Sequence, residues 1–364
     1  MRFGFARIFW RDRSPEIYSM NKQLDSMFAE LARGNPQYLP SKYWQVLNQK
    51  NLDQLAGEGL ENFKRTVALN YFTWVPGRRS DQYRWLKKQI DFMTWLKIVL
   101  VRREYDASSS LTRKQQNEMV CFTRMLWEVT GRTDTAGLLK AIQEPAEGNP
   151  FKIHWRGTLI SQDLANTVLE YYSVREHFNP APGTRATICE LGAGYGREAF
   201  LFLKAMPQIK YIIVDIPPAL YVSEHYLSRV FPDRKVFSFR PFDDYRSVAA
   251  EFESADIAFL LPHQAEMLPS KSVDLFLNIS SLHEMTPEQI EAYFKLIDRL
   301  TGGFFYSKQW KVSQNPYDPV VVRQKDYPVL PTWRQLFVRD AKVQIAFFES
   351  MYAIPGAPAA KQTK

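Results

Sequence analysis

Residues 186–206, ATICELGAGYGREAFLFLKAM, decide the fold of this chain. The segment begins with a short apolar run that ends near Glu190, and a turn with Gly192, Gly194 and Gly196 follows. Apolar residues at helical spacing start directly after the turn. Because glycine permits positive φ angles and lets a ligand approach the backbone, the segment predicts a strand, a ligand-binding turn and a helix.

Four further apolar runs follow along the chain, each rich in branched or aromatic residues and separated from the next by a helical stretch. They are YIIVDI (211–216), IAFLL (257–261), VDLFLNI (273–279) and GFFYSKQW (303–310). This alternation predicts an α/β fold with a parallel sheet covered by helices on both faces. Ligands bind at the carboxyl ends of the strands in such a sheet, so polar residues at those ends are candidates for a site.

The first part of the chain has a different pattern, because its apolar residues recur at helical spacing. EPAEGNP at 144–150 marks a boundary, and the last residues are mostly small residues, proline and lysine. We therefore predict a mainly helical region over 1–147, an α/β domain over 148–352 and a flexible tail over 353–364. The helical region would serve as a lid over a substrate or as the surface of a homodimer.

The bulk composition is that of a folded globular protein, with 364 residues of which 45% are hydrophobic. The N-terminal residues carry scattered charges and do not resemble a secretory signal. The most apolar window, 92–101, is too short to span a membrane and contains Lys97. Cys121 and Cys189 stand alone, which disfavours a disulfide or a cysteine-based zinc site. We therefore expect a cytoplasmic protein without a membrane span.

The glycine turn resembles the first motif of the class I S-adenosylmethionine-dependent methyltransferases. In ELGAGYG an acidic residue stands two positions ahead of a GxGxG run, and Asp215 ends the next strand 19 residues after Gly196. A carboxylate there can accept hydrogen bonds from both hydroxyls of a ribose. A dinucleotide-binding fingerprint would need glycine where the chain has Arg197. The resemblance implies a Rossmann-like methyltransferase sheet with S-adenosylmethionine as the cofactor.

A narrower resemblance is to a family of sugar O-methyltransferases that occurs with gene sets for glycosylated natural products and surface polysaccharides. It covers about residues 148–350 and rests on the phrases SQDLAN, ICELGAGYGREAF, DIPPALYVSE, FLLPHQAEML and NISSLHEM. This resemblance implies methyl transfer to a hydroxyl of a sugar or a glycosylated compound.

The methyltransferase resemblance also implies which residues hold the cofactor. Glu190 would lie near its amino-acid end, Asp215 would hold the ribose and Ile216 would lie beside the adenine. The glycines would let the backbone approach, and the ends of the third and fourth core strands would add further contacts. The full set is Glu190, Gly192, Gly194, Gly196, Asp215, Ile216, Pro262, His263, Gln264 and Asn278. For His263, a place in a surface turn is the alternative.

Methyl transfer to a hydroxyl needs a group that removes the proton from oxygen, and histidine is a common general base. His283 follows the fourth core strand, so we predict that it is the base; a hydrogen bond to the local turn is the alternative. Glu284 would orient the base, bind the acceptor or form a salt bridge. Lys308, at the end of the fifth core strand, would either stabilise an alkoxide or lie on the surface.

Further polar residues are candidates for contacts with the acceptor or for a lid. They come from the helix before the first core strand and from the loop after the fourth: Gln162, Asp163, Asn166, Ser280 and Ser281. No group of residues has the spacing of a metal site, so we predict that no metal is needed.

Four other functions are alternatives. A nucleic-acid methyltransferase would fit the basic first part of the chain, but those that methylate amino groups usually carry an Asn/Asp-Pro-Pro-Tyr/Phe type of motif where this chain has NISS. A nicotinamide oxidoreductase is opposed by Arg197. A methyltransferase for a non-sugar small molecule and a noncatalytic protein that binds S-adenosylmethionine stay open.

Overall fold

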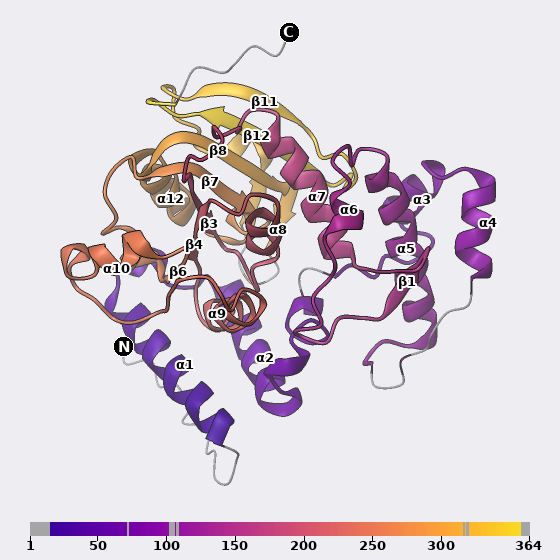
Figure 1. Cartoon of the computed structure of the whole chain (residues 1–364), viewed down its shortest axis with the longest axis horizontal. Helices are drawn as coiled ribbons and strands as arrows, with labels where there is room; N and C mark the ends of the chain where they lie inside the picture. The colour runs from indigo at the N-terminus through magenta and orange to yellow at the C-terminus, as the bar shows by residue number, and fades with distance from the viewer. Residues whose placement is uncertain are drawn as a thin grey trace.

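The centre of the molecule is an eight-stranded sheet in the order β11-β12-β8-β7-β3-β4-β6-β5 (Figure 1). Its strands are β3 (Thr187–Leu191), β4 (Lys210–Val214), β5 (Val236–Phe237), β6 (Ile257–Leu260), β7 (Val273–Ile279), β8 (Thr301–Trp310), β11 (Arg334–Asp340) and β12 (Phe347–Ala353). The structure is a computed structural model, and it describes residues 15–70, 73–101, 106, 109–315, 317 and 320–357.

Helices cover both faces of the sheet (Figure 1). Helices α7 (Gln162–Arg175), α8 (Arg197–Ala205) and α9 (Ala219–Val230) pack on one face. The other face is covered by α10 (Ala249–Ser254), α11 (Pro262–Ala265) and α12 (Pro287–Leu300). All residues of β4 and β6 are buried, as expected for central strands with helices on both sides.

The strands predicted from the sequence correspond to β3, β4, β6, β7 and β8, which pair in parallel with their neighbours in this group. The fold class is confirmed: a mixed α/β sheet flanked by helices and preceded by a helical region. Two strands that the sequence did not predict extend this parallel sheet at one edge: β12 runs antiparallel to β8, and β11 runs antiparallel to β12. A short connection joins β11 to β12, and a hairpin needs no crossover helix.

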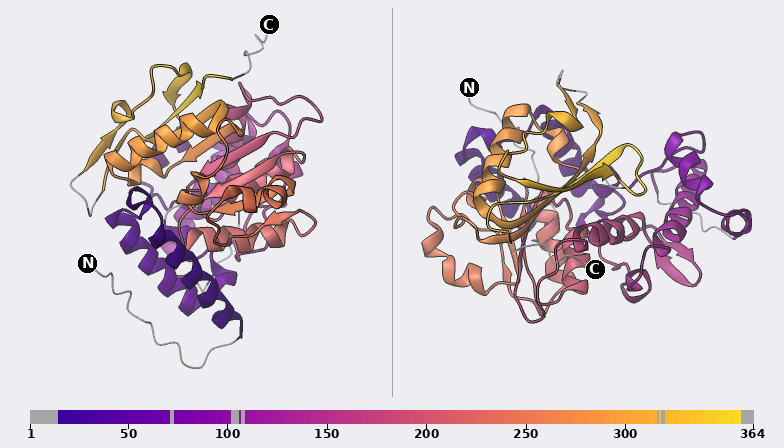
Figure 2. Two further views of the ribbon diagram at one scale, coloured as in Figure 1. Left: turned by 90° about the vertical axis from the view of Figure 1, so that its left-hand side faces the viewer. Right: turned by 90° about the horizontal axis from the view of Figure 1, so that it is seen from above.

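The helical region falls into two parts. Helices α1 (Pro15–Arg33) and α2 (Lys42–Glu58), with η1 (Pro36–Tyr38) between them, contact the α/β domain through bonds such as that of Arg33 to Asp243. The other part contains α3 (Asp81–Lys88), α4 (Phe92–Leu100), α5 (Arg113–Gly131), α6 (Leu138–Ala141) and the hairpin of β1 (Ile153–Trp155) and β2 (Thr158–Ile160). Most of this second part forms a core with one side of α7 and stands apart from the sheet (Figure 2).

A second hairpin, of β9 (Val312–Gln314) and β10 (Val321–Arg323), follows β8 and precedes β11. In the described part of the chain, no helix is both long and apolar enough to cross a membrane. The domain boundaries given above stay predictions, and residues 358–364 of the predicted tail lie outside the described residues.

Candidate functional site

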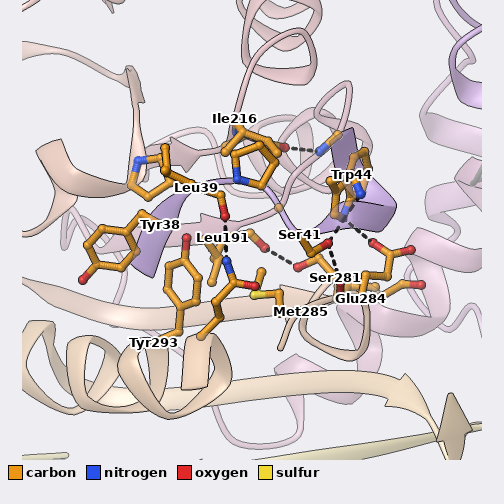
Figure 3. A pocket seen from close by; sticks show the side chains of 18 residues that line it. Tyr38, Leu39, Ser41, Trp44, Leu191, Ile216, Ser281, Glu284, Met285 and Tyr293 are labelled. Carbon is orange, nitrogen blue, oxygen red and sulfur yellow. Dashed lines mark hydrogen bonds between the residues drawn. The ribbon is translucent and has the colours of Figure 1, made fainter. Parts of the chain in front are cut away.

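The strand order reverses between β3 and β7. From β3 the chain proceeds to β4 and β6 on one side, and it then returns to β7 on the other side. In open α/β sheets, ligands bind outside the carboxyl ends of the strands at such a switch point. A pocket lies there, and Leu191, Gly192, Ile279 and Ser281 from the ends of these two strands line it (Figure 3).

The pocket encloses about 730 Å³ of space, including open solvent at its mouth. Its lining combines the strand ends with residues from the beginning of the chain and from α12. The 18 lining residues are Tyr38, Leu39, Pro40, Ser41, Trp44, Leu191, Gly192, Gly194, Asp215, Ile216, Pro262, Ile279, Ser280, Ser281, Glu284, Met285, Gln289 and Tyr293.

The glycine turn after β3 has the conformation that glycine favours, with φ angles of 73° at Gly192 and 60° at Gly194. A Cβ atom at Gly192 would lie 2.3 Å from Ser281 Oγ, so no larger residue fits between the two strand ends. Gly196 caps α8 and packs against Leu227, behind the pocket. The turn therefore exposes backbone atoms to the pocket at its first two glycines.

Asp215 directly follows β4, where its carboxylate is held by the backbone. Gly194 N–H donates to Oδ2 at 2.8 Å, and Ile216 N–H donates to Oδ1 at 2.7 Å. Burial raises the pKa of Asp215 to about 7, although both backbone hydrogen bonds lower it. The carboxylate is therefore fixed in position and has lone pairs left for a ligand.

Glu284 is the second acidic residue of the pocket lining. Trp44 Nε1 donates to its Oε2 at 3.0 Å, and Ser41 Oγ donates to its backbone carbonyl at 2.9 Å. Burial raises the pKa of Glu284 to about 8. Asp215 and Glu284 are the charged residues among the described residues that line the pocket, so the pocket is acidic when they ionise.

Residues 38–44 form one wall of the pocket, which the sequence did not predict. In Figure 3, Tyr38, Leu39, Ser41 and Trp44 follow one another from left to right along the pocket. Gln289 Nε2 from α12 donates to Leu39 O at 2.6 Å and holds this segment in place. The segment NPQYLPSKYW (35–44) is rich in proline and aromatic residues, but 243 positions separate Ser41 from Glu284, and the sequence alone gives no sign of that contact.

His283 lies beside the pocket and does not line it. Its Nδ1 is 2.9 Å from Gln309 Oε1. Gln309 Nε2 donates to Asn278 Oδ1, which fixes the orientation of the Gln309 amide. The oxygen of this amide therefore accepts a hydrogen bond from Nδ1–H of His283. Nε2 then carries the lone pair and lies 3.8 Å from Glu284 Oε1. Burial lowers the pKa of His283 to about 4, so the imidazole is neutral near pH 7.

Other predicted residues divide between the pocket and the core. Ile216, Pro262, Ser280 and Ser281 line the pocket. Asn278 is fully buried and connects the two strand ends, because its Nδ2 donates to Leu191 O at 2.9 Å and to Ser281 Oγ at 2.6 Å.

His263 and Gln264 follow β6 and do not line the pocket. His263 Nε2 is 3.2 Å from Glu30 of α1, and Gln264 Oε1 accepts from Leu261 N–H at 3.0 Å to cap α11. The described contacts of both side chains are therefore structural.

Lys308 and Glu190 lie on the face of the sheet covered by α7 and α8. Lys308 Nζ is 2.7 Å from Glu170, which also pairs with Arg197 at 2.6 Å. Tyr211 donates to Glu190 at 2.7 Å, and burial raises the pKa of Glu190 to about 7. Both residues belong to a buried polar network outside the pocket lining, and the roles predicted for them stay predictions.

The predicted residues of α7 also lie outside the pocket lining. Gln162 exchanges hydrogen bonds with the backbone of Trp74, and Asp163 accepts from Tyr195 at 2.5 Å. Asn166 is buried, and its Oδ1 has no partner among the described atoms. Within the described residues, no three His, Cys, Asp or Glu side chains come together as a metal site. Metal independence stays a prediction.

No protein-family model matches the chain, and no curated protein matches it. Among solved structures, the PH0226 protein from Pyrococcus horikoshii OT3 is 15% identical, over 51% of this chain and 87% of its own, with a TM-score of 0.36. A SAM dependent methyltransferase from Aquifex aeolicus is 14% identical, over 51% of this chain and 96% of its own, with a TM-score of 0.30.

A third structure, of the glycopeptide N-methyltransferase MtfA with S-adenosylmethionine, is 12% identical, over 52% of this chain and 87% of its own, with a TM-score of 0.33. Similarities at such low TM-scores do not assign a function to this chain. Its function is therefore argued from the pocket.

Proposed function

We propose that the protein is an S-adenosylmethionine-dependent O-methyltransferase. The observation that carries the proposal is the acidic lining of the pocket at the switch point, where the acidic residues are Asp215 and Glu284 and a bound cation would favour their ionised forms. S-adenosylmethionine carries a sulfonium cation and no phosphate, whereas a nicotinamide dinucleotide carries a pyrophosphate that two carboxylates would repel. An acidic pocket beside a glycine turn therefore favours a cationic nucleoside.

The residues present fit such a cofactor. Asp215, fixed by two backbone N–H groups, would accept hydrogen bonds from the ribose hydroxyls. Gly192 and Gly194 would lie against the cofactor with their backbones, and Ile216 and Pro262 would contact the flat adenine. When bound, S-adenosylmethionine supplies an activated methyl group on sulfur.

The groups that would remove the acceptor's proton are Glu284 and His283. Glu284 reaches the pocket, and His283 Nε2 carries a lone pair 3.8 Å from its carboxylate. We propose His283 as the general base acting through Glu284: the Glu284 carboxylate takes the proton from the acceptor hydroxyl and passes it to Nε2 of His283. A nearby sulfonium would lower the pKa of Glu284 and favour its ionised form.

The acceptor class comes from the sequence resemblance, which supports a hydroxyl of a sugar or a glycosylated compound. The cytoplasmic location and a homodimer formed through the helical region also stand as proposals. A non-sugar acceptor and a noncatalytic cofactor-binding protein are the alternatives.

Titration calorimetry with S-adenosylmethionine and, separately, with NAD tests the cofactor. We expect the first to bind and the second not to bind; the reverse result would overturn the proposal. Mass spectrometry of reactions with a panel of glycosides and matched aglycones then tests the acceptor. If only the aglycones are methylated, the acceptor is not a sugar. Cofactor binding without any methylated product would favour the noncatalytic alternative.

A further inference from the structure

A second cavity lies beside β8, β11 and β12, on the face of the sheet that α12 covers. It encloses about 1180 Å³, including its open mouth. Consecutive residues of α12 line the two cavities, Tyr293 the cofactor pocket and Phe294 the second cavity. Five rings form much of its lining: Phe294, Phe305, Tyr327, Phe348 and Tyr352.

Four residues of the lining carry a hydroxyl group: Ser307, Tyr327, Ser350 and Tyr352. Ser307 of β8 is paired with Ser350 of β12, and they are 4% and 2% exposed. The hydroxyl of Tyr327 is buried and has no hydrogen-bond partner among the described atoms. This oxygen has almost no exposed surface, so it lies within the wall and not on the surface of the cavity.

The charge of the second cavity is opposite to that of the cofactor pocket. Among the described residues that line it, the charged ones are Lys311, Arg323 and Lys325. Lys311 pairs with Asp340 at 2.8 Å, whereas Arg323 and Lys325 are exposed on β10 and the turn that follows it. Aromatic walls with cations at the rim fit a flat molecule that carries a negative group.

A chain of side chains connects this cavity to the cofactor pocket. Ser307 Oγ accepts from Gln309 Nε2 at 3.1 Å, and Gln309 Oε1 accepts from His283 Nδ1 at 2.9 Å. His283 Nε2 lies 3.8 Å from Glu284, which lines the cofactor pocket. Ser307 in the lining of the second cavity is therefore connected through Gln309 to His283 and Glu284, the residues proposed to take up the acceptor's proton.

We propose that the second cavity holds the non-reacting part of the methyl acceptor, and that this part is aromatic or similarly flat and bears a carboxylate or a phosphate. That the bound molecule is the methyl acceptor rests on the proposed methyl transfer. The prediction that the cavity binds an anion does not depend on that proposal. Arg323 and Lys325 bind the negative group, and the rings enclose the flat body.

The test uses the full chain and three probes that share a nitrophenyl ring. They are p-nitrophenyl β-D-glucuronide, p-nitrophenyl phosphate and the neutral p-nitrophenyl β-D-glucoside, titrated by calorimetry at low salt. We expect at least one acidic probe to bind about three- to tenfold more tightly than the glucoside, as for two exposed charge contacts. Comparison of the glucuronide with the phosphate distinguishes the two kinds of anion.

Two variants locate the binding. In the Arg323→Gln/Lys325→Gln variant the preference for the acidic probe should disappear, while Lys88→Gln/Lys97→Gln, which removes exposed cations of α3 and α4, should retain it.

S-adenosylmethionine is titrated into the same samples, and its affinity should be the same in all of them. If it binds and the acidic probes bind no better than the glucoside, or equally well to the Arg323→Gln/Lys325→Gln variant, the inference is wrong. If the acidic probes bind as expected and S-adenosylmethionine does not, the anion site stands and the proposed methyl transfer fails.

Discussion

Asp215→Asn is the most direct test of the cofactor site. The substitution keeps the size of the side chain and removes its charge. At present both carboxylate oxygens accept a backbone hydrogen bond, from Gly194 at 2.8 Å and from Ile216 at 2.7 Å. An asparagine amide keeps one acceptor oxygen and places an NH2 group against the other backbone N–H, so the side chain must rotate or leave one bond unmade.

The expected loss follows from the bonds to the ribose. A hydrogen bond to a charged group contributes about 1.5–3 kcal/mol, and the amide keeps part of this for one hydroxyl. We therefore expect the binding of S-adenosylmethionine to weaken by about 2–4 kcal/mol, which is about 30-fold to about 700-fold in Kd. The absence of a buried carboxylate in the variant partly offsets the unmade backbone bond, so the fold should persist.

Titration calorimetry at about pH 8, where the wild-type carboxylate is mostly ionised, measures the affinity. A melting curve of the same sample separates weak binding from unfolding. Asp243→Asn is the matched control, because Asp243 pairs with Arg33 on the surface and its side chain is 82% exposed. If Asp215→Asn binds S-adenosylmethionine within about threefold of the wild type, the ribose role of Asp215 and the argument built on it are refuted.

The other predictions concern the base, pH and the glycine turn. His283→Ala should keep the cofactor affinity and lower turnover about 100-fold to 10,000-fold; near-normal turnover would remove His283 as the base. Burial raises the pKa of Asp215 to about 7 and that of Glu284 to about 8, so a cation that binds their ionised forms should bind more tightly as the pH rises from about 6 to about 9, measured by calorimetry. Gly192→Ala should lower the free energy of unfolding by about 1–3 kcal/mol in urea titrations, because the added Cβ would lie 2.3 Å from Ser281 Oγ at a φ of 73°.

The pH dependence of the protein's stability tests the raised pKa values independently of ligand binding. Because the pKa values of Asp215 and Glu284 are raised in the folded protein, these residues keep their protons at pH values at which they have lost them in the unfolded chain. The stability they contribute is complete below about pH 4 and is lost as the pH rises through about 7 to 8, so melting temperatures across this range test the same pKa values. A cofactor affinity independent of pH would contradict them. Gly157→Ala, at a φ of 81° with open space around it, controls for backbone strain alone.

Much of the sheet could be predicted because its central strands are short apolar runs between helices. The glycine turn and Asp215 could be placed at the ligand-binding edge for the same reason, since each directly follows such a run. The antiparallel β11 and β12 were missed, because their hairpin lacks the strand and helix alternation that indicates a parallel sheet.

Side chains near strand ends were harder to place, because neighbouring residues of a strand point to opposite faces. In β8, Lys308 faces α7 and pairs with Glu170, while the adjacent Gln309 faces the loop after β7 and bonds to Asn278. In β3, Glu190 joins the buried network, and Leu191 lines the pocket. Which of two adjacent residues reaches a site depends on the phase of the strand, and a short apolar run does not determine it.

The wall formed by residues 38–44 has a consequence for the rate of turnover. Trp44 and Leu39 are tied across the pocket to Glu284 and Gln289. If a nucleoside cofactor binds in the pocket as proposed, these bonds hold the wall against it, and the spent cofactor would leave more slowly than from a pocket without them. The Trp44→Phe variant, without the indole N–H, should release the spent cofactor faster. If this release limits the catalytic cycle, the variant would have a higher turnover rate than the wild type.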